Sequence, residues 1–168
     1  MTITIRALSP DDWPILRAFW LAGLADFPVF FGGYDGAATA PAQMWKNALQ
    51  GPRHQMFGLF DDASLIGITA AFSQHEDPQG QTAIFGMSFI APEFRGRGLS
   101  RLLYEARLEW IRAHPEFRRV ILSHRASNQE SRRAHRRYGF VLTGRVMQTG
   151  PDGKTEPEEI YEMALSGA

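Results

Sequence analysis

The stretch from Ser88 to Ala106, SFIAPEFRGRGLSRLLYEA, limits the possible folds more than any other part of the sequence. Its first residues are apolar and prone to form a strand, and its last residues place apolar side chains at helical spacing. A proline and two glycines, the latter interleaved with arginines, separate these patterns. The stretch therefore predicts a strand that passes through a tight turn directly into a helix.

The turn at residues 95–101 combines the features of an anion site. A helix that begins there presents unpaired backbone N–H groups, and its dipole favours negative charge. Gly96 and Gly98 let the main chain approach a phosphate closely, and the neighbouring arginines add positive charge. We therefore expect this turn to hold a phosphate or a pyrophosphate. The alternative is a tight turn surrounded by solvated arginines.

Motifs of several other catalytic and nucleotide-binding sites do not occur in the sequence. The P-loop pattern GxxxxGK(S/T) is absent, and GxGxxG fails because Arg101 stands at the third glycine position. The nucleophile elbow GxSxG and the zinc motif HExxH are missing as well.

The remaining patterns predict one α+β domain over residues 1–168, built around a mixed sheet. Residues 25–41 show no period and predict an irregular loop. The apolar face of the helix after the turn would carry Leu99, Leu102, Leu103, Ala106 and Trp110. Other helices are predicted at residues 9–24, 41–51 and 127–139, and strands at residues 2–8, 54–61, 64–74, 82–90, 118–126, 140–149 and 158–165.

Composition narrows the class of protein. The chain has no cysteine, which excludes disulfides, thiolate metal sites and a cysteine nucleophile, and we expect no bound metal. The N-terminal residues lack the apolar core of a signal peptide, so we expect a cytoplasmic protein. A net charge of zero gives no general attraction for nucleic acid or membrane. Twelve arginines against five carboxylates between Ala91 and Phe140 nevertheless make one part of the chain positive.

Two motifs resemble those of the GCN5-related N-acetyltransferases, the GNAT family. The sequence RGRGLS, residues 95–100, is similar to the family signature Arg/Gln-x-x-Gly-x-Gly/Ala. The sequence NQESRRAHRRYGF, residues 128–140, is similar to the family pattern Asn-x-x-Ala-x-x-x-Tyr-x-Lys-x-Gly-Phe. The predicted order of elements agrees with the family fold over residues 2–165. The resemblance implies a three-layer α+β fold, with a central, mixed and mostly antiparallel sheet of about seven strands flanked by helices.

The resemblance also implies that the cofactor is acetyl-coenzyme A. Its pantetheine arm would hydrogen-bond to the backbone of Phe89 and Ile90, and its pyrophosphate would lie in the turn. Asn128 would contact the cofactor from a later loop. The turn residues expected to hold the pyrophosphate are Arg95, Gly96, Arg97, Gly98, Leu99, Ser100 and Arg101.

Departures from the family pattern affect the expected catalytic residues. His135 replaces the tyrosine that commonly serves as general acid, and the strand at residues 82–90 has no carboxylate, where many members carry the general base. Imidazole can donate a proton near neutral pH, so His135 is the predicted acid and Tyr138 the fallback. His124, together with Ser123, is the predicted base. In the alternative, His135 only hydrogen-bonds or packs against the cofactor, and Tyr138 is a core aromatic residue.

The resemblance implies an N-acetyltransferase that uses acetyl-coenzyme A and an amine acceptor. We expect direct transfer in a ternary complex, because no cysteine is available to carry the acetyl group. The alternative is a noncatalytic acyl-coenzyme A binding or sensor module. The acceptor would be a small molecule or a peptide amine, and family members frequently pair as homodimers.

The segment between the first two predicted helices is expected to form a wall of the acceptor site. Its aromatic side chains suit an apolar or aromatic acceptor, whereas its carboxylates suit a cationic amine, and the sequence leaves both open. The aromatic residues are Phe27, Phe30, Phe31 and Tyr34, and the carboxylates are Asp26 and Asp35.

Overall fold

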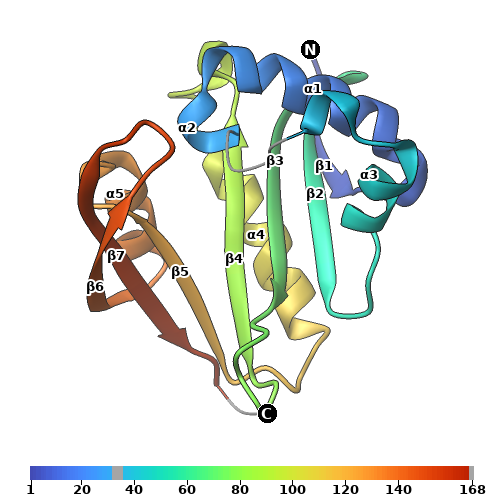
Figure 1. The fold of residues 1–168 in the computed structure, drawn as a ribbon. Coiled ribbons are helices and arrows are strands. Elements are labelled where there is room, and N and C mark those ends of the chain that lie inside the picture. The colour runs from blue at the N-terminus through green and yellow to red at the C-terminus, as the bar shows by residue number, and fades with distance from the viewer. Residues whose placement is uncertain (32–35, 167–168) are drawn as a thin grey trace.

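The computed structural model describes residues 1–31 and 36–166, so the predicted acceptor-site residues Tyr34 and Asp35 lie outside the described residues. Within this part of the chain, seven strands form one mixed sheet in the order β1-β2-β3-β4-β5-β7-β6 (Figure 1). Neighbouring strands are antiparallel except for β4 and β5, which are parallel. The strands are β1 (Ile3–Ala7), β2 (His54–Asp61), β3 (Ser64–Ser73), β4 (Thr82–Ile90), β5 (Arg119–Arg125), β6 (Val141–Thr149) and β7 (Thr155–Ala164).

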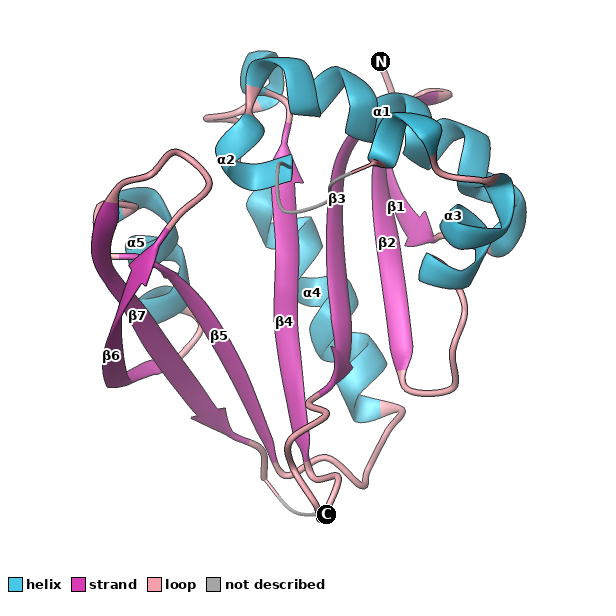
Figure 2. Ribbon diagram, in the orientation of Figure 1, coloured by secondary structure: helices cyan, strands magenta, loops and turns pink. Residues whose placement is uncertain are grey.

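Helices cover both faces of the sheet, which confirms the predicted three-layer α+β class (Figure 2). The helices α1 (Trp13–Asp26), α2 (Pro28–Phe31) and α3 (Ala42–Ala48) lie over one face, and α4 (Ser100–Arg112) and α5 (Gln129–Arg137) lie over the other. Short 3-10 turns complete the described elements: η1 (Pro10–Asp12), η2 (Ala37–Thr39) and η3 (Pro92–Phe94). No helix in the described ranges has the length and apolar character needed to cross a bilayer.

Residues 25–41 are more regular than the sequence predicts. The helix α2 and the 3-10 turn η2 lie within this segment. Pro28 occupies the first position of α2, where its fixed φ angle suits a helix and its missing N–H costs nothing. A helix of one turn is too short to produce an apolar period, so pattern analysis could not find it.

Each face of the sheet has its own hydrophobic core. Leu16, Phe31 and Trp45 from α1, α2 and α3 pack against Ile68 of β3 and other strand residues on one face. On the other face, side chains of α4 and α5 pack against β4, β5 and β7. The two cores fix both layers of helices relative to the sheet.

The strands β4 and β5 separate soon after they begin. They pair only at Thr82–Ile84 against Arg119–Ile121, and β5 continues along β7 alone. The pairing of β3 with β4 slips by one residue between Ile68 and Ala70, and Met87 on β4 has a φ angle of 54°. A one-residue bulge bends a strand away from its neighbour. The second half of β4 therefore presents a free backbone edge toward β5.

A buried ion-pair network ties α5 to the last two strands. The Glu159 carboxylate is 1% exposed. It accepts hydrogen bonds from Arg132 of α5 at 2.8 Å, Arg145 of β6 at 3.2 Å and the Tyr161 hydroxyl at 2.9 Å. Burial raises the pKa of Glu159, but the hydrogen bonds from Tyr161, Arg132 and Arg145 outweigh burial and bring the pKa below its usual value.

Replacing Glu159 with glutamine is expected to lower the melting temperature by about 5–10 °C, because two arginines then lose a buried partner. The folded-state pKa of Glu159 is lowered, so its contribution is complete above the unfolded pKa of about 4.3 and disappears as the pH falls through the folded value. Thermal melts at a series of pH values below 7 should therefore show a difference between the variant and wild type that is largest at neutral pH and shrinks as the pH falls below about 4.3.

The matched control is Glu162→Gln on the same strand. The Glu162 carboxylate is 3.6 Å from Arg119 and its side chain is 31% exposed. A half-exposed pair contributes little, so the expected shift is at most about 2 °C. Equal shifts for the two variants would contradict the role given to the buried network.

Candidate active site

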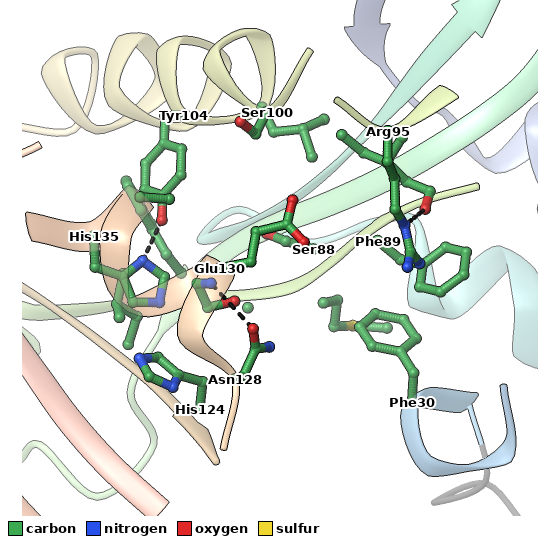
Figure 3. Close-up of a pocket in the computed structure, with 18 of the residues that line it drawn as sticks. Phe30, Ser88, Phe89, Arg95, Ser100, Tyr104, His124, Asn128, Glu130 and His135 are labelled. Atoms are coloured by element: carbon green, nitrogen blue, oxygen red, sulfur yellow. Dashed lines mark hydrogen bonds between the residues drawn. The ribbon is translucent and has the colours of Figure 1, made fainter. Parts of the chain in front are cut away.

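A cleft of about 880 Å³ opens where β4 and β5 separate. Its walls come from the α1–α2 junction, the second half of β4, the turn before α4, the end of β5 and the start of α5 (Figure 3). Most of the residues predicted to bind the cofactor or to catalyse the reaction border this one cleft, although they come from distant parts of the sequence.

The turn before α4 has the geometry of an anion cradle. Gly96 and Gly98 have φ angles of 72° and 73°, a left-handed conformation that side chains disfavour. The backbone N–H groups of residues 96–100 donate to no acceptor in the described ranges, and Leu99 at the N-cap makes no side-chain cap. These five consecutive free donors lie at the N-terminus of the 13-residue helix α4, and four of the five residues, Gly96, Gly98, Leu99 and Ser100, border the cleft. Such an arrangement favours a phosphate group.

The three predicted arginines of the turn have different positions. Arg95 borders the cleft, and its Nε donates to the Ile90 carbonyl at 2.8 Å. Arg97 turns back to the Glu93 carbonyl, at 3.1 Å. Arg101 pairs with Glu105 at 3.0 Å on the exposed side of α4. Neither Arg97 nor Arg101 is among the cleft-lining residues in the described chain, so direct contact of either with the pyrophosphate stays a prediction.

The other predicted cofactor residues border the cleft. Phe89 and Ile90 lie on the part of β4 that has no partner on β5, and Leu99 and Ser100 follow the glycines of the turn. The Asn128 side chain also reaches the cleft, where it caps α5 by accepting a hydrogen bond from the Ser131 N–H at 3.0 Å (Figure 3). Asn128 thus fixes the start of α5 at the cleft wall.

Two histidines meet at one side of the cleft. The rings of His124, at the end of β5, and His135, on α5, have centroids 4.9 Å apart (Figure 3). Nδ1 of His124 bonds to the Arg125 carbonyl at 2.8 Å. A carbonyl can only accept, so Nδ1 carries the hydrogen and the neutral ring has its lone pair on Nε2. That Nε2 is buried and has no hydrogen-bond partner within the described residues.

His135 is 9% exposed and forms a hydrogen bond through Nδ1 with the hydroxyl of Tyr104 on α4 (Figure 3). Burial, with the charges of His124 and Arg107 adding to it, lowers the pKa of His135 to about 3. His135 is therefore neutral in neutral solution, and only its N–H can act as a donor.

The stability of the protein should fall in acid because His135 cannot take a proton in the folded state. The unfolded side chain binds a proton below pH 6.5, whereas the folded one does so only below about 3. Over this interval the free energy of unfolding should rise with pH by up to about 1.4 kcal/mol per unit from this group. Urea unfolding between pH 4 and 7 measures the slope. The His135→Asn variant should have a smaller slope, and an unchanged slope would contradict the assignment.

Sequence reasoning missed two residues of this region, Tyr104 and Arg107. Both are buried on α4, and both border the cleft. A signal was available, since Leu103, Arg107 and Ile111 recur at four-residue spacing and therefore share one helix face. An arginine within an apolar helix face indicates a buried charge, which is uncommon in proteins and often has a specific partner.

Tyr138 occupies a different position from the one predicted for a fallback acid. It is the C-cap residue of α5, and its ring stacks on Tyr104 with centroids 4.2 Å apart. It does not border the cleft as described, whereas Tyr104 does. Its predicted catalytic role remains untested, and its surroundings match the alternative of a packed aromatic residue.

The acceptor side of the cleft is mainly aromatic. Phe27 and Phe30 border it, and their rings lie 5.2 Å and 5.0 Å from the ring of Phe89. Phe31 is fully buried in the core and does not face the cleft. Asp26 borders the cleft beside these rings. The apolar wall and the carboxylate are thus adjacent, so the cleft has features that suit both of the acceptor classes that the sequence leaves open.

The sequence matches the family model described as the acetyltransferase (GNAT) family over residues 20–140. The chain belongs to this family. As a GNAT acetyltransferase it uses acetyl-coenzyme A as acetyl donor and an amine as acceptor. The resemblance stated from the two sequence motifs is therefore confirmed.

Solved structures share the GNAT fold over nearly the whole chain. A GNAT acetyltransferase from Streptococcus pneumoniae has a TM-score of 0.81 at 19% identity, covering 98% of this chain and 100% of that chain. An N-acetyltransferase from Staphylococcus aureus Mu50 has a TM-score of 0.81 at 18% identity, with coverage of 99% and 100%. Arabidopsis thaliana NAA60, in complex with acetyl-CoA, has a TM-score of 0.75 at 17% identity, with coverage of 99% and 100%. The sequence has no significant match among curated proteins.

Proposed function

We propose that this GNAT protein binds acetyl-coenzyme A in the cleft between β4 and β5 and passes the acetyl group directly to an amine in a ternary complex. The observation that carries the proposal is the row of five free N–H groups at residues 96–100, most of which belong to residues that border the same cleft as the half-buried His124 and the buried His135. A diphosphate and a reactive acyl group could thus be held by one continuous site.

Each part of the cleft has a role in this proposal. The N–H groups of the turn bind the pyrophosphate, with Arg95 adding charge at the rim. The free edge of β4 near Phe89 and Ile90 offers backbone groups to an extended arm, as an added strand would use them. Acetyl-coenzyme A, when bound, supplies an activated thioester.

The amine must be neutral to attack, and an alkyl ammonium loses its proton only near pH 10 in water. We assign the general base to His124, because this residue borders the cleft and its Nε2 lone pair has no hydrogen-bond partner within the described residues. The β4 strand has no carboxylate for this task. The base could act directly or through one water molecule, as general bases do in other enzymes.

The acceptor is proposed to be a small molecule or a peptide with a primary amine. Phe27 and Phe30 favour an apolar body near the amine, and Asp26 can attract a cationic group. Homodimer formation and a cytoplasmic location stay predictions from the sequence.

A thiol-release assay with acetyl-coenzyme A and a panel of amines tests the proposal. The panel should contain arylalkylamines, polyamines and peptides with a free N-terminus. We expect thiol release that depends on the acceptor, with a mass increase of the acceptor equal to one acetyl group. Tight coenzyme A binding with no turnover on any amine would instead support the sensor module.

A further inference from the structure

The inner end of the cleft contains a polar cluster within an apolar core. Phe85 and Leu122 directly follow the last paired residues of β4 and β5 and close this end. Beside them lie Tyr104 and Arg107 of α4 and His135 of α5. Tyr104 and Arg107 are 5% and 2% exposed, and both border the cleft.

We propose that the Tyr104 hydroxyl is the hydrogen-bond donor that stabilises the sulfur of coenzyme A as the acetyl group leaves, and that His135 is a positioning residue for that hydroxyl. This inference rests on the proposed function, because it assigns one step of acetyl transfer. Tyr104 lies one helical turn beyond Ser100, a rise of about 6 Å along α4. A ligand that is bound in the turn and extends along the free edge of β4 would therefore pass close to Tyr104.

The protonation states favour Tyr104 over His135 as the donor. His135 carries no ionisable proton at neutral pH, since its pKa is lowered to about 3 by burial. Burial raises the pKa of Tyr104 to about 12, so the hydroxyl keeps its hydrogen at every working pH. A thiol ionises near pH 8.5, by analogy with cysteine. Complete transfer of the proton from Tyr104 to sulfur is therefore uphill, and a hydrogen bond is what Tyr104 can supply.

His135 can direct the Tyr104 hydroxyl toward the cleft. A neutral imidazole has one donor nitrogen. With the hydrogen on Nδ1, His135 donates to the phenol oxygen, and the hydroxyl hydrogen is free to point at the sulfur. His135, which replaces the tyrosine of the family pattern, thus orients Tyr104, a different tyrosine that comes from α4.

Arg107 is an independent sign that negative charge develops in this corner. Its guanidinium carbon lies 4.5 Å from the Phe85 ring centroid and 4.6 Å from that of Tyr104. No carboxylate in the described chain forms an ion pair with it. Burial lowers the pKa of Arg107 to about 10, so it remains charged at neutral pH. A buried cation without a carboxylate favours an anion that arrives with the substrate.

The step is balanced without a change in Tyr104. The amine nitrogen forms a bond to the carbonyl carbon, the carbon–sulfur bond breaks, and its electron pair goes to sulfur. The proton lost by nitrogen goes to His124 and then to solvent. The thiolate, stabilised by the hydrogen bond from Tyr104, takes a proton from solvent on release.

Ionisation of coenzyme A bound to the protein tests the proposal without turnover. The chain has no cysteine, so coenzyme A supplies the only thiol, and thiolate absorbance follows its titration. We expect the bound thiol to have a pKa about one to two units lower in wild type than in Tyr104→Phe, since a hydrogen bond to a charged acceptor is worth this much. Arg107, His135 and Tyr138 contact Tyr104, and His124 lies beside His135. These groups are the same in both complexes, so the difference isolates the hydroxyl.

Kinetics provide the second readout. Tyr104→Phe should lower kcat about 10- to 100-fold and change KM for acetyl-coenzyme A less than threefold. His135→Asn can still donate from its amide and should retain most of the activity, whereas His135→Phe should lose as much as Tyr104→Phe. The double variant Tyr104→Phe/His135→Phe should be no slower than either single variant, because the two side chains act as one unit.

Melting temperatures establish that each variant is folded. Equal thiol pKa values in the wild-type and Tyr104→Phe complexes would overturn the proposal, as would a larger loss of kcat in Tyr138→Phe than in Tyr104→Phe. A protein that lowers the thiol pKa through Tyr104 but acetylates no amine would overturn the proposed function and leave this assignment standing.

Discussion

Replacing Gly98 with valine is expected to weaken coenzyme A binding about 100-fold while the protein remains folded. Gly98 has a φ angle of 73°, and a Cβ atom there would meet no described atom within 4 Å. The expected effect comes from the backbone. The left-handed conformation costs a β-branched residue about 1–2 kcal/mol, so valine would favour a different φ angle and change the path of the turn. The N–H groups of residues 98–100 would then no longer converge, and hydrogen bonds to the charged phosphates would be lost. Calorimetric titration with coenzyme A measures the affinity.

Gly153→Val is the matched control for this experiment. Gly153 has the same φ angle of 73°, and a Cβ atom there also meets nothing within 4 Å, but it lies in the turn between β6 and β7. Both variants introduce similar local strain, so both should melt at slightly lower temperatures. Only Gly98→Val should lose affinity for coenzyme A. Equal losses in both, or wild-type affinity in Gly98→Val, would rule out the anion cradle.

The parts of the protein that the sequence predicts well depend on local pattern. The strands and the turn at residues 95–101 are visible because alternation, glycine and cap residues act over a few neighbouring positions. The mixed sheet followed from the order of these elements and from the two family motifs. Gly96 and Gly98 of this turn have positive φ angles, which few other residues tolerate.

Side-chain direction and long-range contacts are less accessible to sequence analysis. Arg97 and Arg101 flank the glycines in the sequence, but the path of the turn directs them away from the cleft. Tyr104 and His135 are 31 residues apart, and they meet only because α4 and α5 pack on the same face of the sheet. Tyr138 directly follows the last residue of α5, and its ring stacks on Tyr104, a contact that the local sequence does not show.

In the proposed mechanism, the adjacent histidines His124 and His135 take opposite tasks. His135 is held by Tyr104 and positions a donor, whereas the Nδ1 bond of His124 to the Arg125 carbonyl leaves its other nitrogen as a lone pair. A buried imidazole nitrogen without a partner is costly to the fold. In the proposed mechanism, a hydrogen of the substrate occupies this nitrogen during the reaction.

His124→Gln is therefore expected to lower kcat for an alkylamine acceptor about 100-fold, the effect of losing a general base, with little change in coenzyme A affinity. An aromatic amine is already neutral at pH 7.5, so its acetylation should fall less than fivefold in the same variant. His114→Gln is the control, because its Nδ1 also bonds to a backbone carbonyl, that of Trp110 at 2.8 Å, outside the cleft. A loss that is equal for both acceptor classes would show that His124 shapes the cleft and does not remove the amine proton.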